Sequence, residues 1–155
     1  MIEDKLREIG IELPIPPAPA GSYIPVITTG NIAFVSGQIA MKDGNVIFQG
    51  KVPSEQSVDS ARDAAILCIT NGLAQLKANI GSLDNITKFV RVSGFVNSNS
   101  NFSEQPKVIN AASDLLVEVF GDMAKHSRIA VGVASLPLNS TVEIDMIVEF
   151  KKWNS

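Results

Sequence analysis

Two charged residues near the C-terminus lie in runs that alternate between apolar and other residues, where burial of a charged side chain would be unfavourable without a partner. Arg128 begins the run R-I-A-V-G-V-A, and Glu143 lies in T-V-E-I-D-M-I-V-E-F, which follows a Leu-Pro turn. A desolvated guanidinium is costly unless it meets an anion, and its planar fork matches a carboxylate. The pattern predicts a small-anion site at Arg128. The alternative is a structural ion pair between Arg128 and Glu143 or Asp145.

The composition limits the class of protein. The chain has 155 residues, of which 45% are hydrophobic and 19% charged, and its net charge is −3. We therefore expect one globular domain over residues 1–155. Because no cluster of lysine and arginine occurs, neither a nucleic-acid surface nor a membrane patch is expected. The charged N-terminus lacks an apolar signal segment and no apolar run is long enough to span a bilayer, so we expect a cytoplasmic protein.

The single cysteine, Cys68, excludes an internal disulfide and a cysteine-based metal site. It falls inside an expected helix, where a free cysteine usually behaves as a small buried apolar residue. We therefore assign it no chemistry.

Two amphipathic helices are expected to position the candidate residues. Apolar residues recur every three or four positions over residues 54–80 and 103–120, which predicts helices with one apolar face. Ser54 or Ser57 is expected to cap the first helix, and Ser103 the second.

The N-terminal 20 residues are expected to form a short helix and the start of an arm. The helix is predicted over residues 3–9. Five prolines follow within residues 11–25, and such a segment is extended because proline is incompatible with a helix interior.

Alternation of apolar and polar residues predicts a sheet. The predicted strands are residues 26–28, 32–36, 46–48, 85–96, 128–134 and 141–150, with residues 41–45 as a turn. This order favours an α+β fold with a mixed, mostly antiparallel sheet and both helices packed on one face. In the last strand, Val142 and every second residue after it should meet the helices. Glu143 should face solvent or a neighbouring subunit.

Four separated motifs occur in a distinctive order and spacing. They are G-S-Y at 21–23, N-I-A-F-V-S-G-Q at 31–38, V-I-N at 108–110, and R-I-A-V-G-V-A-S-L-P with V-E-I at 128–137 and 142–144. They resemble the Rid family, the reactive intermediate deaminases, also called YjgF-like or endoribonuclease L-PSP-like proteins. The resemblance covers roughly residues 20–150. The proline-rich arm and the helix Q-P-K-V-I-N-A-A-S-D-L-L-V-E-V-F-G further resemble a subgroup of less defined function.

The resemblance implies a chorismate-mutase-like fold and a homotrimer with ligand sites in clefts between subunits. It implies hydrolysis of reactive 2-imino acids to 2-keto acids and ammonia, without metal or organic cofactor. A trimer that binds a small carboxylate without turning it over is the alternative. An endoribonuclease is the third candidate, and it is disfavoured by the acidic chain and its single histidine.

The resemblance also suggests roles for individual residues. Arg128 would bind the substrate carboxylate, and Glu143 would hold or activate the attacking water. Asn110 and Ser36 would supply neutral hydrogen bonds to substrate or water. The structural alternatives are a solvated strand residue for Glu143, surface polarity for Asn110 and a strand-end cap for Ser36.

The remaining candidates would shape the pocket. Gly37 would let a ligand approach the backbone closely, and Tyr23 would wall the pocket. Their alternatives are a plain turn and packing of the arm. Ala130 stands where many family members have cysteine, so only its backbone could bond a ligand. His126 could act as an acid near neutral pH but is interpreted as a surface or loop residue.

Overall fold

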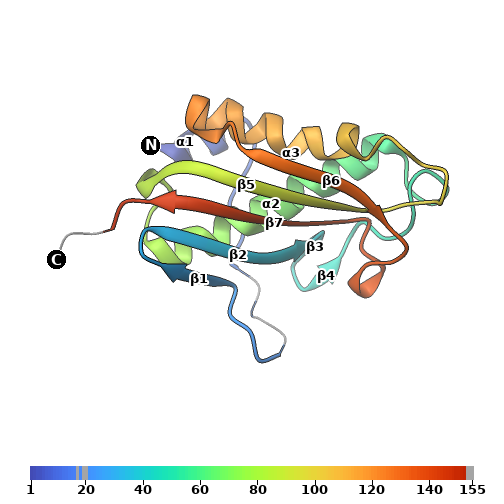
Figure 1. The fold of residues 1–155 in the computed structure, drawn as a ribbon, viewed down its shortest axis with the longest axis horizontal. Coiled ribbons are helices and arrows are strands. Elements are labelled where there is room, and N and C mark those ends of the chain that lie inside the picture. Colours follow the sequence, from blue (N-terminus) through green and yellow to red (C-terminus); the bar gives the residue numbers. More distant parts are fainter. Residues whose placement is uncertain (17, 19–20, 153–155) are drawn as a thin grey trace.

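The structure, a computed structural model, describes residues 1–16, 18 and 21–152 (Figure 1). The helices are α1 (Ile2–Glu8), α2 (Val58–Ile80) and α3 (Gln105–Phe120). The strands are β1 (Val26–Thr29), β2 (Ile32–Ile39), β3 (Met41–Lys42), β4 (Asn45–Val46), β5 (Ile86–Asn97), β6 (Ser127–Val133) and β7 (Val142–Phe150). Within the described ranges, no helix is long and apolar enough to cross a bilayer.

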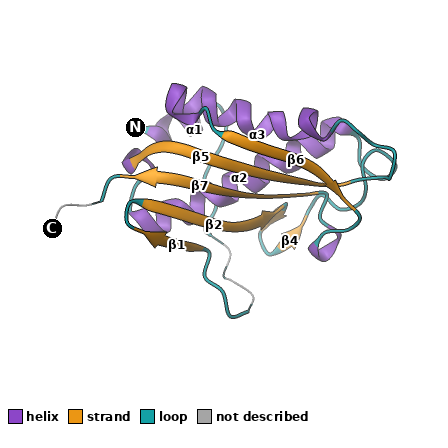
Figure 2. Ribbon diagram, viewed as in Figure 1, coloured by secondary structure: helices purple, strands orange, loops and turns teal. Residues whose placement is uncertain are grey.

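Five strands form one sheet in the order β1-β2-β7-β5-β6. Neighbours are antiparallel except β5 and β6, which are parallel. Figure 2 shows α2 and α3 on the same side of this sheet, with α3 along β6. The expected α+β class, the mostly antiparallel sheet and the common face for both helices are therefore confirmed. We call the opposite side of the sheet its outer face.

The core lies between the sheet and the two long helices. On β7 the residues at positions 142, 144, 146 and 148 are at most 2% exposed, whereas Glu143, Asp145 and Ile147 are half-buried. This is the predicted alternation, and it follows because successive strand side chains point to opposite faces. Because only one face of β7 is fully buried, the apolar alternation determines which side chains of this strand point toward the helices.

The second strand runs further than expected because it contains a β-bulge. Val35 pairs with Met146 and Gln38 with Ile144, so Ser36 and Gly37 together lie opposite one residue of β7. The predicted strand end at residue 36 is therefore wrong. A bulge adds a residue without ending the pairing, which the local sequence does not reveal.

The segment after the bulge also differs from the prediction. Residues 41–45, expected as a turn, form most of a small hairpin in which Met41 pairs with Val46. Residues 46–48 do not form a separate strand, because β4 ends at Val46. Asn71 of α2 binds this hairpin, and its Nδ2 donates to the carbonyls of Ile39 (3.2 Å) and Met41 (2.8 Å).

The helix starts were only partly predicted. Ser57 caps α2, and its Oγ accepts from the amide of Ser60 at 3.0 Å. Ser54 instead donates to Asn99. In α3 the N-cap is Glu104 and not the expected Ser103, and Pro106 falls in the first turn. Proline lacks the N–H that is unused there, so it favours a start at this point.

The N-terminal helix packs on the domain through Ile2 and Leu6, which are buried. Beyond it, Ile11 and Leu13 of the arm pack against the core. Residues 17, 19 and 20 of the predicted arm lie outside the described residues.

Close packing of β5 against α3 gives a first prediction. A Cβ added to Gly94 would lie 2.5 Å from Cγ1, 2.6 Å from Cδ1 and 2.8 Å from Cγ2 of Ile109. We expect Gly94→Ala to destabilise the protein by about 1–3 kcal/mol, because overpacking forces the core to shift. Urea unfolding measures the effect.

The double variant Gly94→Ala/Ile109→Ala provides the matched control. The smaller side chain at 109 makes room for the new methyl group, so the double variant should be more stable than the sum of the single losses predicts. Simple additivity would contradict the proposed contact.

Candidate functional site

Arg128 lies on the edge strand β6, on the same side of the sheet as α3. It pairs in register with Val92 of β5, which is fully buried under the helices. The half-buried Arg128 side chain reaches α3, where its Nη1 donates to Asn110 Oδ1 at 2.7 Å and to Ser113 Oγ at 3.2 Å. Two helix residues therefore hold the guanidinium without neutralising it.

These contacts leave one edge of the guanidinium open. Nη1 carries two hydrogens, and both have acceptors. Among the described residues, no acceptor bonds Nη2 or Nε, and no carboxylate pairs with Arg128. The structural ion pair with Glu143 or Asp145 is therefore not formed. The Nη2–Nε edge is the fork that can bind a carboxylate through two parallel hydrogen bonds.

Two other predicted residues join Arg128. Asn110 projects from α3 and is exposed, and Ala130 lies two residues along β6 in register with Gly94. Alternation along the strand puts Ala130 on the same side as Arg128. We call Arg128, Asn110 and Ala130 the arginine half-site.

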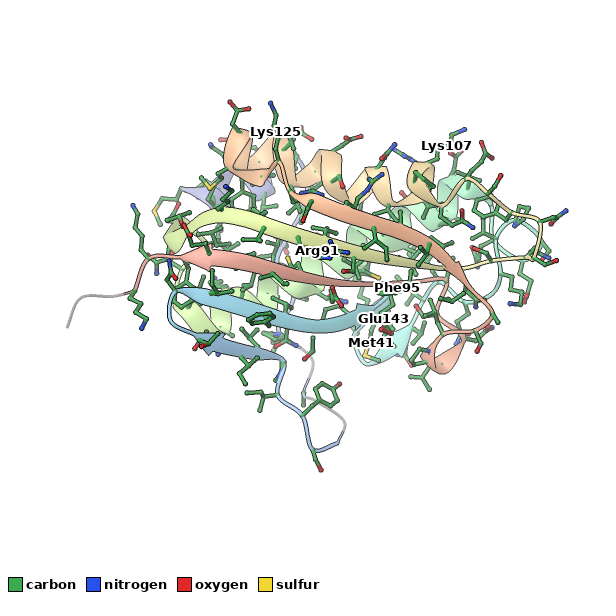
Figure 3. All side chains as sticks on the ribbon, in the orientation of Figure 1. Met41, Arg91, Phe95, Lys107, Lys125 and Glu143 are labelled. Carbon is green, nitrogen blue, oxygen red and sulfur yellow. The ribbon has the colours of Figure 1, made fainter. Side chains whose placement is uncertain are left out.

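Glu143 lies on the outer face of the sheet. It pairs with Phe95 of β5 and Ile39 of β2, and Figure 3 shows it next to Phe95 and near Met41. Burial, followed by the nearby charge of Asp145, raises the pKa of the Glu143 carboxyl above its usual 4.5. A carboxyl with a raised pKa exchanges protons more readily near neutral pH.

A cavity of about 400 Å³ brings Glu143 together with two other predicted residues. Its lining includes Tyr23, Gly37, Glu143 and Leu138. Gly37 lies so close to the carboxylate that an added Cβ would be 2.5 Å from Glu143 Oε2. We call Glu143, Gly37 and Tyr23 the carboxylate half-site. It lies at the bulge of β2, where the extra residue re-aims the backbone.

Ser36, the other bulge residue, has a structural partner. Its Oγ donates to the carbonyl of Ile24 at 2.8 Å and so ties the end of the arm to β2. Its predicted bond to a ligand remains a prediction.

Within one chain the two half-sites lie on opposite faces of the sheet. Arg128 shares the helix side with Val92, whereas Glu143 shares the outer face with Phe95. A sheet with packed side chains lies between them, so a small molecule cannot contact both groups of the same chain. Each half-site alone offers an anion fork or a carboxylate, but not both.

The contacts of Ser113 and His126 were missed by the sequence interpretation. His126 lies in the loop before β6, as expected, but it is half-buried and both its ring nitrogens have partners. Ser113 could have been noticed because it follows Asn110 by three positions, a spacing that places both on one helix face.

The outer face also exposes apolar side chains. Ile27 is 57% exposed, Phe34 41% and Val131 37%. Half-buried apolar residues lie beside them on the same face of neighbouring strands. The apolar residues of the outer face are Ile27, Phe34, Phe95, Ile129, Val131 and Ile147. An apolar surface of this kind is typical of a protein interface.

No metal centre is evident in the part of the chain that the structure describes: no three His, Cys, Asp or Glu residues are grouped to hold an ion.

The short distance between Gly37 and Glu143 gives a second prediction. We expect Gly37→Ala to lower kcat/KM for the reaction proposed below by about 10- to 100-fold, because the added methyl group displaces the carboxylate. Thermal stability should change little, since the atom that must move is the free end of a flexible side chain. Steady-state kinetics and a melting curve test both parts. A large loss of stability would contradict the local explanation.

Comparison with known proteins gives a consistent set of matches. The family described as "YjgF/chorismate_mutase-like, putative endoribonuclease" matches residues 3–150. Protein TCP17 of Trypanosoma cruzi is 39% identical over 145 residues, which cover 93% of this chain and 91% of that protein. The 2-iminobutanoate/2-iminopropanoate deaminase of Dermatophagoides farinae is 32% identical over 138 residues, 89% of this chain and 93% of the relative.

Solved structures agree with the fold. The crystal structure of protein Atu1372 from Agrobacterium tumefaciens, of unknown function, superposes with a TM-score of 0.92 and 44% identity. The match covers 97% of this chain and 92% of the other. The expected chorismate-mutase-like fold is thereby confirmed.

Proposed function

Because this chain belongs to the YjgF/chorismate mutase-like family, we propose that it hydrolyses reactive 2-imino acids to 2-keto acids and ammonia. The observation that carries the proposal is the half-buried Arg128, which is held by two neutral acceptors and keeps its Nη2–Nε edge open. The deaminase relative at 32% identity supports the reaction class.

The half-sites suggest a division of labour. Arg128 binds the carboxylate of the imino acid and fixes the direction of the adjacent C=N carbon. Water adds to that carbon, and Glu143 accepts the proton that the water loses. Glu143 returns that proton to the imine nitrogen, which gives a carbinolamine with one hydroxyl and one amino group on the same carbon. Glu143 then takes the hydroxyl proton and passes it to the amino nitrogen, so the C=O bond forms as the C–N bond breaks and ammonia leaves with the 2-keto acid. Little further catalysis is needed, since an imine carbon is already electrophilic.

The active site of this proposal is shared between two copies of the chain. Arg128 of one copy and Glu143 of the next would face the same substrate, because the two residues of one chain lie on opposite faces of the sheet. The exposed apolar side chains of the outer face supply a surface for such an assembly. A homotrimer with three equivalent sites satisfies this head-to-tail arrangement with closed symmetry.

A coupled assay tests the activity. An amino-acid oxidase generates the imino acid in situ, and semicarbazide, which captures free imine, reports how much survives. The wild-type protein should accelerate ammonia release and reduce the captured fraction. No acceleration with any of several imino acids would reject the enzyme.

The alternative is a trimer that binds small carboxylates without hydrolysis. It rests on the same open Nη2–Nε edge of Arg128, which would bind a carboxylate whether or not hydrolysis follows. Binding of a 2-keto acid without imine turnover would support this alternative.

A further inference from the structure

A chain of hydrogen bonds runs from Arg128 into the protein. Arg128 Nη1 lies 3.2 Å from Ser113 Oγ, which lies 2.9 Å from His126 Nε2. His126 Nδ1 lies 2.6 Å from the carbonyl oxygen of Ala124. The chain thus connects β6, α3 and the turn that joins them.

The direction of each bond follows from chemistry. The carbonyl of Ala124 can only accept, so Nδ1 of His126 carries the hydrogen, and Nε2 of the neutral ring is an acceptor. Ser113 therefore donates its hydroxyl hydrogen to His126. The lone pairs of Ser113 Oγ then face Arg128, which can only donate. Each of the three hydrogen bonds, from Arg128 to Ser113, from Ser113 to His126 and from His126 to Ala124, then has one donor and one acceptor.

The surroundings of His126 favour the neutral imidazole that this series of hydrogen bonds requires. Burial, with a smaller contribution from the charge of Arg128, lowers the pKa of His126, against the opposing effect of the Ala124 bond. At neutral pH the acceptor at Nε2 is therefore kept.

We propose that Ser113 and His126 are positioning residues that hold the guanidinium plane of Arg128 so that its Nη2–Nε edge faces the ligand carboxylate. Asn110 alone would fix one hydrogen of Nη1 and leave the plane free to swing. Ser113 fixes the second hydrogen, and His126 fixes the orientation of the Ser113 hydroxyl. For the identity of the ligand, the inference rests on the proposed function.

Conservative pairs of variants separate this role from simple packing. Ser113→Ala removes the acceptor, whereas Ser113→Thr keeps it. The matched pair at His126 works in the same way. The side-chain amide of His126→Asn can still donate to the Ala124 carbonyl but does not reach Ser113. The longer side chain of His126→Gln places an acceptor near the position of His126 Nε2. Ser113→Ala and His126→Asn should each weaken binding of 2-oxobutanoate by about 3- to 10-fold, the effect of one hydrogen bond. The Thr and Gln variants should bind nearly as well as wild type.

Kinetics provide a second signature. KM should rise in Ser113→Ala while kcat changes less, because Arg128 contacts the carboxylate in both the ground and the transition state. In the Arg128→Ala background, Ser113→Ala should have no further effect on binding or KM. An equal loss in both backgrounds would overturn the proposal.

A readout on the ligand-free protein separates this inference from the proposed function. NMR relaxation of the Arg128 Nε–H group should report an ordered side chain in the wild type and a mobile one in Ser113→Ala. If the wild type binds no 2-keto acid, the proposed function fails, and the NMR result alone decides the positioning role. If the wild type binds but Ser113→Ala leaves both affinity and order unchanged, the positioning role fails and the proposed function stands.

Discussion

Replacement of Arg128 by alanine is expected to lower kcat/KM for imine hydrolysis by about 10²- to 10³-fold, since it removes two charge-assisted hydrogen bonds to the substrate carboxylate. No carboxylate among the described residues pairs with this guanidinium, so no buried acid is left unbalanced by the change. The unfolding temperature should therefore remain close to that of the wild type. Initial rates of ammonia release over a range of imino acid concentrations measure the loss.

Arg128→Lys is the matched control. Lysine keeps the positive charge but presents a point charge in place of a planar fork, so its activity should lie between those of the wild type and the alanine variant. Equal activity of Arg128→Ala and the wild type would exclude Arg128 from substrate binding. Loss of folding in both variants would indicate the structural role instead.

The second large effect is expected at Glu143. Glu143→Gln keeps the size of the side chain but cannot accept a proton, and kcat should fall by about 10²- to 10⁴-fold, the usual contribution of a general base. KM should change little, because Arg128 still binds the carboxylate. Steady-state kinetics separate the two parameters. A rise in KM with unchanged kcat would assign Glu143 to binding.

The pH profile of the wild type tests the same role. A base is active only when deprotonated, so kcat/KM, which reports the groups of the free enzyme, should fall as the pH decreases through the pKa of Glu143. Burial raises that pKa, and the acid limb should therefore have its midpoint above 4.5. This limb should disappear in Glu143→Gln, whose residual activity has no carboxylate to titrate at this position.

Mixing the two inactive variants tests whether the site is shared. If each site combines Arg128 of one chain with Glu143 of the next, co-refolded Arg128→Ala and Glu143→Gln chains would form roughly a quarter of sites with both groups intact. Activity should return to that level, although neither variant is active alone. If both groups acted from one chain, the mixture would stay inactive.

The accuracy of the sequence interpretation differed between elements for identifiable reasons. Both long helices and the face of β7 were predicted because their apolar periodicity is local and each buries a single face. The bulge at Ser36 and Gly37 was not, since it depends on which β7 residue lies opposite. The cap of α3 was misplaced because serine and glutamate can both precede a helix, and Pro106 decided between them.

The sequence by itself determined the two long helices, the five strands of the main sheet and their apolar faces, because apolar periodicity is local. It also indicated Arg128, because a charge that begins an alternating apolar run is visible without coordinates, whereas the resemblance to the Rid family singled out Glu143 among the acids of its run. Only the tertiary structure decided that these two residues lie on opposite faces of one sheet, since the parallel pairing of β6 with β5 is a long-range contact. It also decided that Asn110 and Ser113 meet Arg128 and that His126 stands behind them. Such contacts join residues up to 18 positions apart, and packing of α3 against the sheet alone brings them within hydrogen-bonding distance.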